Sequence, residues 1–86
     1  MFCVYMLESV KDGSYYIGST SDLRRRLEEH NNGKSKSTKS RGPFKLIYYE
    51  AYISEKDAKH REHNLKLGSR ALAQLRKRLE DTLNLH

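Results

Sequence analysis

The sequence has 86 residues, and 17 lysine and arginine residues against 11 aspartate and glutamate residues give it a formal charge of +6. A chain of this length has room for one hydrophobic core, so we expect a single domain over residues 1–86. Its one cysteine, Cys3, excludes an intrachain disulfide and a cysteine-based zinc framework, and favours a reducing compartment, the cytoplasm. No apolar run approaches the roughly 20 residues of a transmembrane helix, and the N-terminus lacks the residue order of a signal peptide.

The first predicted elements form a β-hairpin. Residues 2–7 are continuously apolar, which is typical of a strand covered on both faces, and Asp12-Gly13 is a strong turn signal before a return strand at 15–18. If Asp12 and Gly13 are the only turn residues, the numbers of opposed residues add up to 25. Tyr5 and Tyr16 then share one face of the sheet, and a slide of the register by two residues keeps them there.

A helix follows the hairpin. Ser21 or Asp22 is the predicted cap, and the helix runs to about Asn32, where Asn-Asn-Gly is a stop signal. Arg26 and His30 fall within the apolar stripe of this helix, one turn apart. Two such side chains can act together on one small anionic group, and phosphate is the obvious candidate.

The remaining elements are a third strand and two more helices. Residues 44–52 alternate as a strand and are the expected partner of the hairpin. The next helix starts with a capping sequence at Ser54 and stops at Gly68, and Glu62 lies on its apolar face. Leucines at helical spacing over 72–83 predict a last helix that packs on the core.

A basic segment without carboxylates separates the first helix from the third strand. By itself this stretch is most simply interpreted as a solvated loop. Together with the other features, it supplies candidate contacts to the phosphates of a nucleic acid, namely Lys34, Lys36, Lys39 and Arg41.

The charged residues on inward faces also have a structural interpretation. Arg26 and Glu62 could form a partly buried ion pair, which adds little net stability, with His30 as a satisfied boundary histidine. His60 and His63 are spaced as metal ligands on a helix, but they lie opposite its apolar face and are interpreted as solvated. The joint occurrence of two tyrosines with Arg26, His30 and Glu62 favours a functional site.

The order of these residues resembles that of the GIY-YIG nucleases, and most closely the small, stand-alone bacterial members. Cys3 stands where the first half of the motif has a glycine. The similarity runs from about residue 3 to 67 and is carried by Cys3-Val4-Tyr5, Tyr16-Ile17-Gly18, Ser19-Thr20, Leu23, Arg26, His30 and the helix bearing Glu62.

The resemblance implies an α+β fold in which helices flank a three-stranded antiparallel sheet in the order β-β-α-β-α-α. It also implies phosphodiester hydrolysis with one divalent metal, Mg²⁺ or Mn²⁺, and Glu62 would be the metal ligand. Arg26 would hold the scissile phosphate and stabilise its charge. Tyr5 and Tyr16 would flank that phosphate, one of them as general base on water, with His30 assisting.

The expected function is therefore that of a metal-dependent endonuclease on DNA or a structured nucleic acid. The protein is expected to act as a monomer or weak homodimer, without a membrane. The alternative is a non-catalytic nucleic-acid-binding module that retains the fold. Glu62 favours the nuclease, because a module that only binds has no use for a carboxylate aimed at phosphate.

Overall fold

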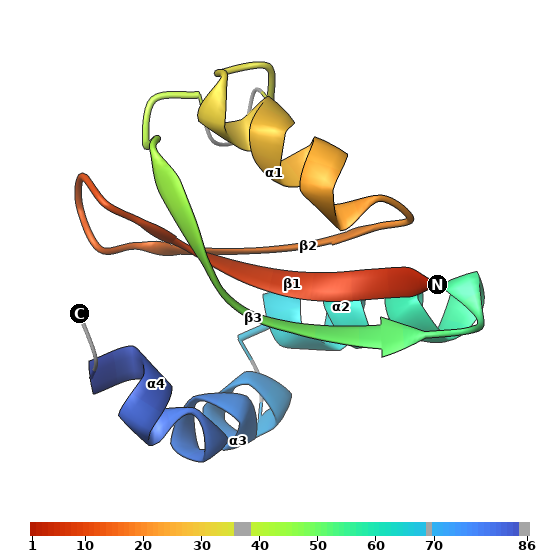
Figure 1. Cartoon of the computed structure of the whole chain (residues 1–86). Coiled ribbons are helices and arrows are strands. Elements are labelled where there is room, and N and C mark those ends of the chain that lie inside the picture. The colour runs from red at the N-terminus through yellow and green to blue at the C-terminus, as the bar shows by residue number, and fades with distance from the viewer. Residues whose placement is uncertain (36–38, 69, 85–86) are drawn as a thin grey trace.

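The structure is a computed structural model that describes residues 1–35, 39–68 and 70–84, so the candidate contact Lys36 lies outside the described residues. In Figure 1, α1 lies on one side of the sheet and α2, α3 and α4 lie on the other. The elements in chain order are β1 (Phe2–Ser9), β2 (Tyr15–Thr20), α1 (Leu23–Asn31), β3 (Phe44–Tyr52), α2 (Glu55–Lys66), α3 (Arg70–Arg78) and α4 (Glu80–Asn84). This is the predicted α+β fold with one further short helix. Among the described residues, no helix combines the length and the apolar character needed to cross a membrane.

Strand β1 is the centre of the sheet, because the strand order is β2-β1-β3 and both neighbours run antiparallel to it. Its alternate side chains enter two separate cores. Val4 and Met6 pack with apolar residues of α2 and α3, whereas Tyr5 and Leu7 pack with those of α1. All four are at most 2% exposed, so the prediction of a strand covered on both faces is confirmed.

The hairpin register differs from the prediction. Tyr5 lies opposite Gly18, so the numbers of opposed residues add up to 23 and the prediction of a two-residue turn is wrong. The turn is longer because Ser9 organises it: its Oγ accepts hydrogen bonds from two backbone N–H groups of the turn, each at 3.2 Å. The slide of two residues leaves the faces unchanged, and the rings of Tyr5 and Tyr16 have their centroids 6.3 Å apart.

Side-chain caps set the start of α1 and α2. Of the two candidates Ser21 and Asp22, Asp22 is the cap of α1, and Ser54 caps α2 as predicted. Each side chain accepts a hydrogen bond from a backbone N–H group in the first turn. Both helices end just before a glycine in the left-handed region, Gly33 with φ +72° and Gly68 with φ +65°. The caps therefore fix which helix face meets the sheet.

The predicted last helix is divided into α3 and α4 at Leu79. The division is slight, since the N–H of Leu79 still donates to the carbonyl of Leu75 at 3.0 Å and that of Leu83 to Leu79 at 2.8 Å. Leu75 and Leu79 are buried, and Leu72 and Leu83 pack partly buried against the same cluster. The leucine stripe thus packs on the core, as predicted.

Candidate active site

The candidate site lies along the edge strand β2, where side chains from α1 and α2 meet. Tyr16 contacts His30 of α1, with ring centroids 4.9 Å apart. Ser19 donates a hydrogen bond to Glu62 of α2 at 2.6 Å. Positions 16 and 19 of a strand point to opposite faces, so β2 joins residues that are held on the two sides of the sheet.

Tyr5 reaches this edge from the central strand by lying over Gly18. A Cβ atom built on Gly18 would be 2.6 Å from Cζ of Tyr5, and closer still to its Oη. It would also be 3.1 Å from Cε1 of Tyr16. Any side chain at position 18 would therefore displace the Tyr5 phenol, and the glycine provides the space that positions it.

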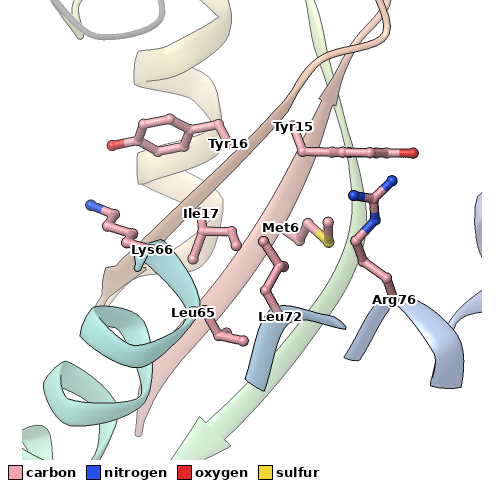
Figure 2. Close-up of a pocket in the computed structure, with 8 residues that line it drawn as sticks. All are labelled: Met6, Tyr15, Tyr16, Ile17, Leu65, Lys66, Leu72 and Arg76. Carbon is pink, nitrogen blue, oxygen red and sulfur yellow. The ribbon is translucent and has the colours of Figure 1, made fainter. Parts of the chain in front are cut away.

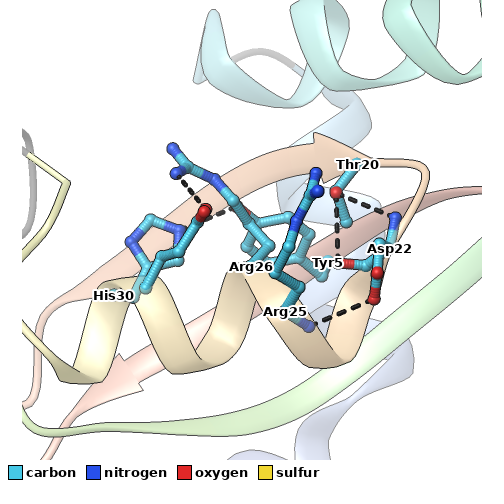
Figure 3. Close-up of polar contacts among 7 residues, drawn as sticks. Tyr5, Thr20, Asp22, Arg25, Arg26 and His30 are labelled. Atoms are coloured by element: carbon cyan, nitrogen blue, oxygen red, sulfur yellow. Dashed lines mark hydrogen bonds and ion pairs between the residues drawn. The ribbon is translucent and has the colours of Figure 1, made fainter.

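The phenol of Tyr5 is hydrogen-bonded to His30, with 2.8 Å between Oη and Nε2 (Figure 3). His30 is 1% exposed. Its burial, and then the charge of Arg26, lower the pKa of His30, which keeps the imidazole neutral at pH 7. Burial, followed by the neighbouring Tyr16, raises the pKa of Tyr5 to about 12. The resting site thus holds a protonated phenol against a neutral imidazole, whose Nε2 accepts the bond when Nδ1 carries the proton.

Arg26 lies one helical turn before His30 and is partly exposed. Its Nη1 donates to Oε1 of Glu29 at 3.0 Å, and this bond raises the pKa of Arg26. The guanidinium also acts on Tyr5, where it opposes the upward shift of the pKa that burial causes. Surface pairs at this spacing contribute only about 0.3 to 0.5 kcal/mol, so Arg26 can exchange Glu29 for a phosphate at little cost.

Glu62 is held by cations of its own helix. Its Oε2 accepts from Nζ of Lys66 at 2.9 Å, and Nζ of Lys59 lies 3.9 Å from Oε1. Burial raises the pKa of Glu62, but the hydrogen bonds from Ser19 and Lys66 lower it more, so the group is ionised. The structural interpretation that paired Glu62 with Arg26 is therefore wrong, because each charge has its own partner.

The chemistry of Glu62 fits a divalent metal of the Mg²⁺ type. An ionised carboxylate supplies a hard oxygen ligand, and Mg²⁺ usually keeps several waters and takes one or two carboxylates together with substrate phosphates. The described residues contain no group of three or more His, Cys, Asp or Glu side chains that could hold a metal by themselves. A single carboxylate completed by a bound phosphate is the arrangement that these residues fit.

The other candidate residues belong to the segment between α1 and β3. Lys34 and Lys39 are exposed, whereas Arg41 is partly buried. Arg41 donates to Oγ of Ser14 at 3.1 Å and lies over the ring of Phe44, 5.8 Å from its centroid. Arg41 thus holds the end of the hairpin, unlike the two lysines.

Three residues of the site were given no role by the sequence. Gly18 makes space for Tyr5, Ser19 orients Glu62, and Lys66 neutralises it. The spacing of four residues between Glu62 and Lys66 was a usable signal for their contact. The role of Gly18 depends on the strand register, and that of Ser19 depends on where α2 packs. No local sequence pattern gives either of these.

Residues 1–78 match the family model of the GIY-YIG catalytic domain, and the chain belongs to this family. GIY-YIG domains form a superfamily of nucleases. The match of residues 1–78 confirms the resemblance that the motif residues indicate.

Individual relatives share the UPF0213 name. A UPF0213 protein of Streptococcus pneumoniae is 52% identical over 64 residues, which are 73% of this chain and 64% of that protein. UPF0213 protein VNG_2274C of Halobacterium salinarum is 43% identical over 72 residues, 83% of this chain and 92% of its own length. The solution NMR structure of UPF0213 protein BH0048 from Bacillus halodurans is 41% identical, with a TM-score of 0.56 over 92% of this chain and 85% of that one. The aligned part of this chain covers 64% of the length of one Streptococcus pneumoniae relative and 56% of the length of another.

Proposed function

We propose that this protein is a metal-dependent endonuclease that hydrolyses phosphodiester bonds in DNA or a structured nucleic acid. The observation that supports this best is the Tyr5–His30 hydrogen bond at the edge of β2, in a cluster that also contains Arg26 and Glu62. These are a proton-transfer pair, a phosphate ligand and a metal ligand, which together are the parts that phosphodiester hydrolysis needs.

Arg26 is the proposed ligand of the scissile phosphate. Its fork of N–H donors matches two phosphate oxygens, and the charge is retained at every working pH. As negative charge grows on the phosphate in the transition state, the bond from Arg26 strengthens. Glu29, which holds Arg26 in the resting site, is then released to solvent.

Tyr5 is the proposed general base, with His30 as the acceptor of its proton. The attacking water gives a proton to Oη of Tyr5 while the phenol proton passes to Nε2 of His30, 2.8 Å away. The water oxygen forms the new bond to phosphorus, the scissile P–O bond breaks, and the leaving oxygen takes a proton from solvent. The pKa of about 12 at Tyr5 disfavours this transfer in the resting site. Arg26 already opposes the upward shift of this pKa in the resting site, and a divalent ion held by Glu62 would favour the transfer further through its positive charge.

Glu62 is the proposed metal ligand, oriented by the hydroxyl of Ser19. A divalent ion bound there would act as a Lewis acid on the phosphate and offset its charge. In the resting site Lys66 forms an ion pair with this carboxylate, and that pair has to open before an ion can bind there.

The test is a cleavage assay on single-stranded, duplex and branched DNA with Mg²⁺, with Mn²⁺ and with a chelator. We expect cleavage that requires the metal and that falls at least about 100-fold in Glu62→Gln, which removes one ligand charge at constant shape. Glu28→Gln is the matched control, since Glu28 is exposed on α1 and the substitution is the same.

Binding without cleavage in any metal would favour the alternative, a non-catalytic nucleic-acid-binding module. Equal rates in wild type and Glu62→Gln would overturn the metal assignment.

The proposed setting is a cytoplasmic protein that acts as one domain over residues 1–86, as a monomer or weak homodimer. The single cysteine, Cys3, is free, which suits a reducing compartment. Lys34 and Lys39, with Lys36 and Arg41 of the same segment, are proposed to contact phosphates of the substrate outside the reaction centre. Sedimentation of the purified chain at several concentrations measures its oligomeric state.

A further inference from the structure

A hollow of about 270 Å³ lies beside the candidate active site, between β2 and the helices α2 and α3 (Figure 2). Its apolar lining comes from β1, β2, α2 and α3 and consists of Met6, Ile17, Leu65 and Leu72. Pockets for small ligands commonly measure roughly 300 to 1,000 Å³. The hollow therefore has room for one ring system and not for a longer segment.

A cation stands against an aromatic ring on each side of this hollow (Figure 2). Cζ of Arg76 lies 5.6 Å from the ring centroid of Tyr15, and Nζ of Lys66 lies 5.6 Å from that of Tyr16. Within the described part of the chain, no carboxylate forms an ion pair with Arg76. The guanidinium is thus held at the rim by Tyr15 and keeps its charge for an anion.

The hollow is continuous with the candidate active site. Tyr16 and Lys66 belong to both, and Nζ of Lys66 is 2.9 Å from the carboxylate of Glu62. A ligand in the hollow would therefore lie one side chain away from the proposed metal ligand.

We propose that this hollow is a nucleotide subsite, which takes the base of one nucleotide next to the scissile phosphate while Arg76 contacts a phosphate of that nucleotide. A flat apolar ring joined to an anionic group matches an apolar, aromatic-lined hollow with cations at its rim. An apolar side chain of a partner protein would fill the hollow but would leave Arg76 without an anion. The position next to the scissile phosphate rests on the proposed function, whereas the binding of a nucleotide does not.

The experiment is an NMR titration of the metal-free wild-type protein with thymidine 5′-monophosphate, and separately with deoxyribose 5-phosphate, which has no base. A mononucleotide contains no phosphodiester bond, so binding is measured without turnover. We expect the methyl resonances of Met6, Ile17 and Leu72 to shift with the nucleotide and to stay in place with the sugar phosphate. Unmoved methyl resonances, or equal shifts with both compounds, would overturn the subsite.

A matched pair of variants tests the role of Arg76. Arg76→Gln should weaken binding of the nucleotide about tenfold, as expected for the loss of one hydrogen bond to a charged group. Arg78→Gln removes the same charge from an exposed position of the same helix, outside the hollow, and should change the affinity less than twofold. Equal weakening in both variants would reduce the effect to net charge and overturn the proposed contact.

Failure of the subsite and failure of the nuclease proposal are distinguishable. Nucleotide binding in the hollow by a chain that cleaves no substrate would leave the subsite standing and overturn the nuclease. Metal-dependent cleavage by a chain whose hollow shows no resonance shifts in the titration would overturn the subsite and leave the nuclease proposal standing.

Discussion

Two tyrosine clusters lie on this small sheet, and they differ in how their charges are satisfied. The β3 cluster consists of Tyr48, Glu50, Tyr52 and Arg61. The phenols of Tyr48, at 2.8 Å, and of Tyr52 both donate to the carboxylate of Glu50, and Nε of Arg61 donates to it at 3.1 Å. Acid, base and both hydroxyls therefore satisfy one another within the cluster, and the bond to Arg61 ties α2 to the sheet.

In the candidate active-site cluster, each charged residue pairs with an oppositely charged residue of its own helix. Arg26 is paired with Glu29 and Glu62 with Lys66, while Tyr5 faces a neutral His30. Mutual neutralisation, as in the β3 cluster, marks a group of residues that stabilises the fold. Charges with exchangeable surface partners mark a group that can receive a ligand.

The largest effect that separates the clusters is expected from removing one hydroxyl in each. Tyr5→Phe should lower the single-turnover cleavage rate at least about 100-fold, since general bases contribute about 10² to 10⁴. Tyr52→Phe should leave the rate unchanged and lower the free energy of unfolding by about 1 kcal/mol. Rates are measured at saturating substrate and stabilities by urea unfolding. Equal rate losses in both variants would show that the comparison is wrong.

Arginine geometry sharpens the same contrast with a smaller change. Arg26→Lys keeps the charge but loses the planar fork, and should reduce turnover about tenfold or more. Arg25→Lys, on the exposed face of the same helix, should stay within about twofold of wild type, as expected for a surface residue. Similar losses in the two variants, in the same cleavage assay, would show that the wrong face of α1 is assigned to the site.

Replacing Glu50 should change the stability of the fold and the dependence of that stability on pH. Burial raises the pKa of Glu50, but hydrogen bonds from Tyr52, Tyr48 and Arg61 lower it more, so this pKa lies below its ordinary value. A carboxyl with a depressed pKa stabilises the fold above its unfolded pKa, and this contribution is lost as the pH falls below about 4.5. Glu50→Gln should cost about 1 to 3 kcal/mol at pH 7 and flatten that loss in acid. Urea unfolding from pH 7 down to pH 3 measures both, and a parallel decline in the variant would count against the assignment.

The smallest expected effect concerns residues outside both clusters. Replacing Lys34 and Lys39 by glutamine should make the slope of log affinity against log salt shallower by about 1.4 to 1.8, at ~0.7 to 0.9 per phosphate contact. Cleavage at saturating substrate should not change, because neither lysine belongs to the site. The slope is measured by fluorescence anisotropy on one oligonucleotide across a salt series. An unchanged slope would leave the segment as a solvated loop.

Much of this fold could be predicted from local patterns, because strands, caps and stop signals depend on neighbouring residues. The hairpin register could not, since it depends on the hydroxyl of Ser9 inside the turn. Among the site residues, the helical stripe indicated Arg26, His30 and Glu62 as inward residues, and the motif resemblance suggested their roles.

What the sequence could not provide were the partners of these residues. The contact of Tyr5 with Gly18 depends on the register between two strands, and the Glu50–Arg61 pair joins β3 to a helix. The polar residues of the β3 cluster look as suitable for chemistry as those of the active site until their mutual hydrogen bonds are seen. Only packing in three dimensions distinguishes the two clusters.

The central position of β1 has a consequence for how the protein is made. Cys3 on β1 pairs with Thr20 on one side and with Ala51 on the other. An isolated two-stranded hairpin is marginally stable at best, so β1 waits for β3 before the sheet is complete. Glu62 follows β3 in the chain, and the candidate active site is therefore completed only after β3. An unfinished chain carries the phenol, the imidazole and the guanidinium but not the carboxylate, so the proposed cleavage requires that synthesis has passed Glu62 of α2.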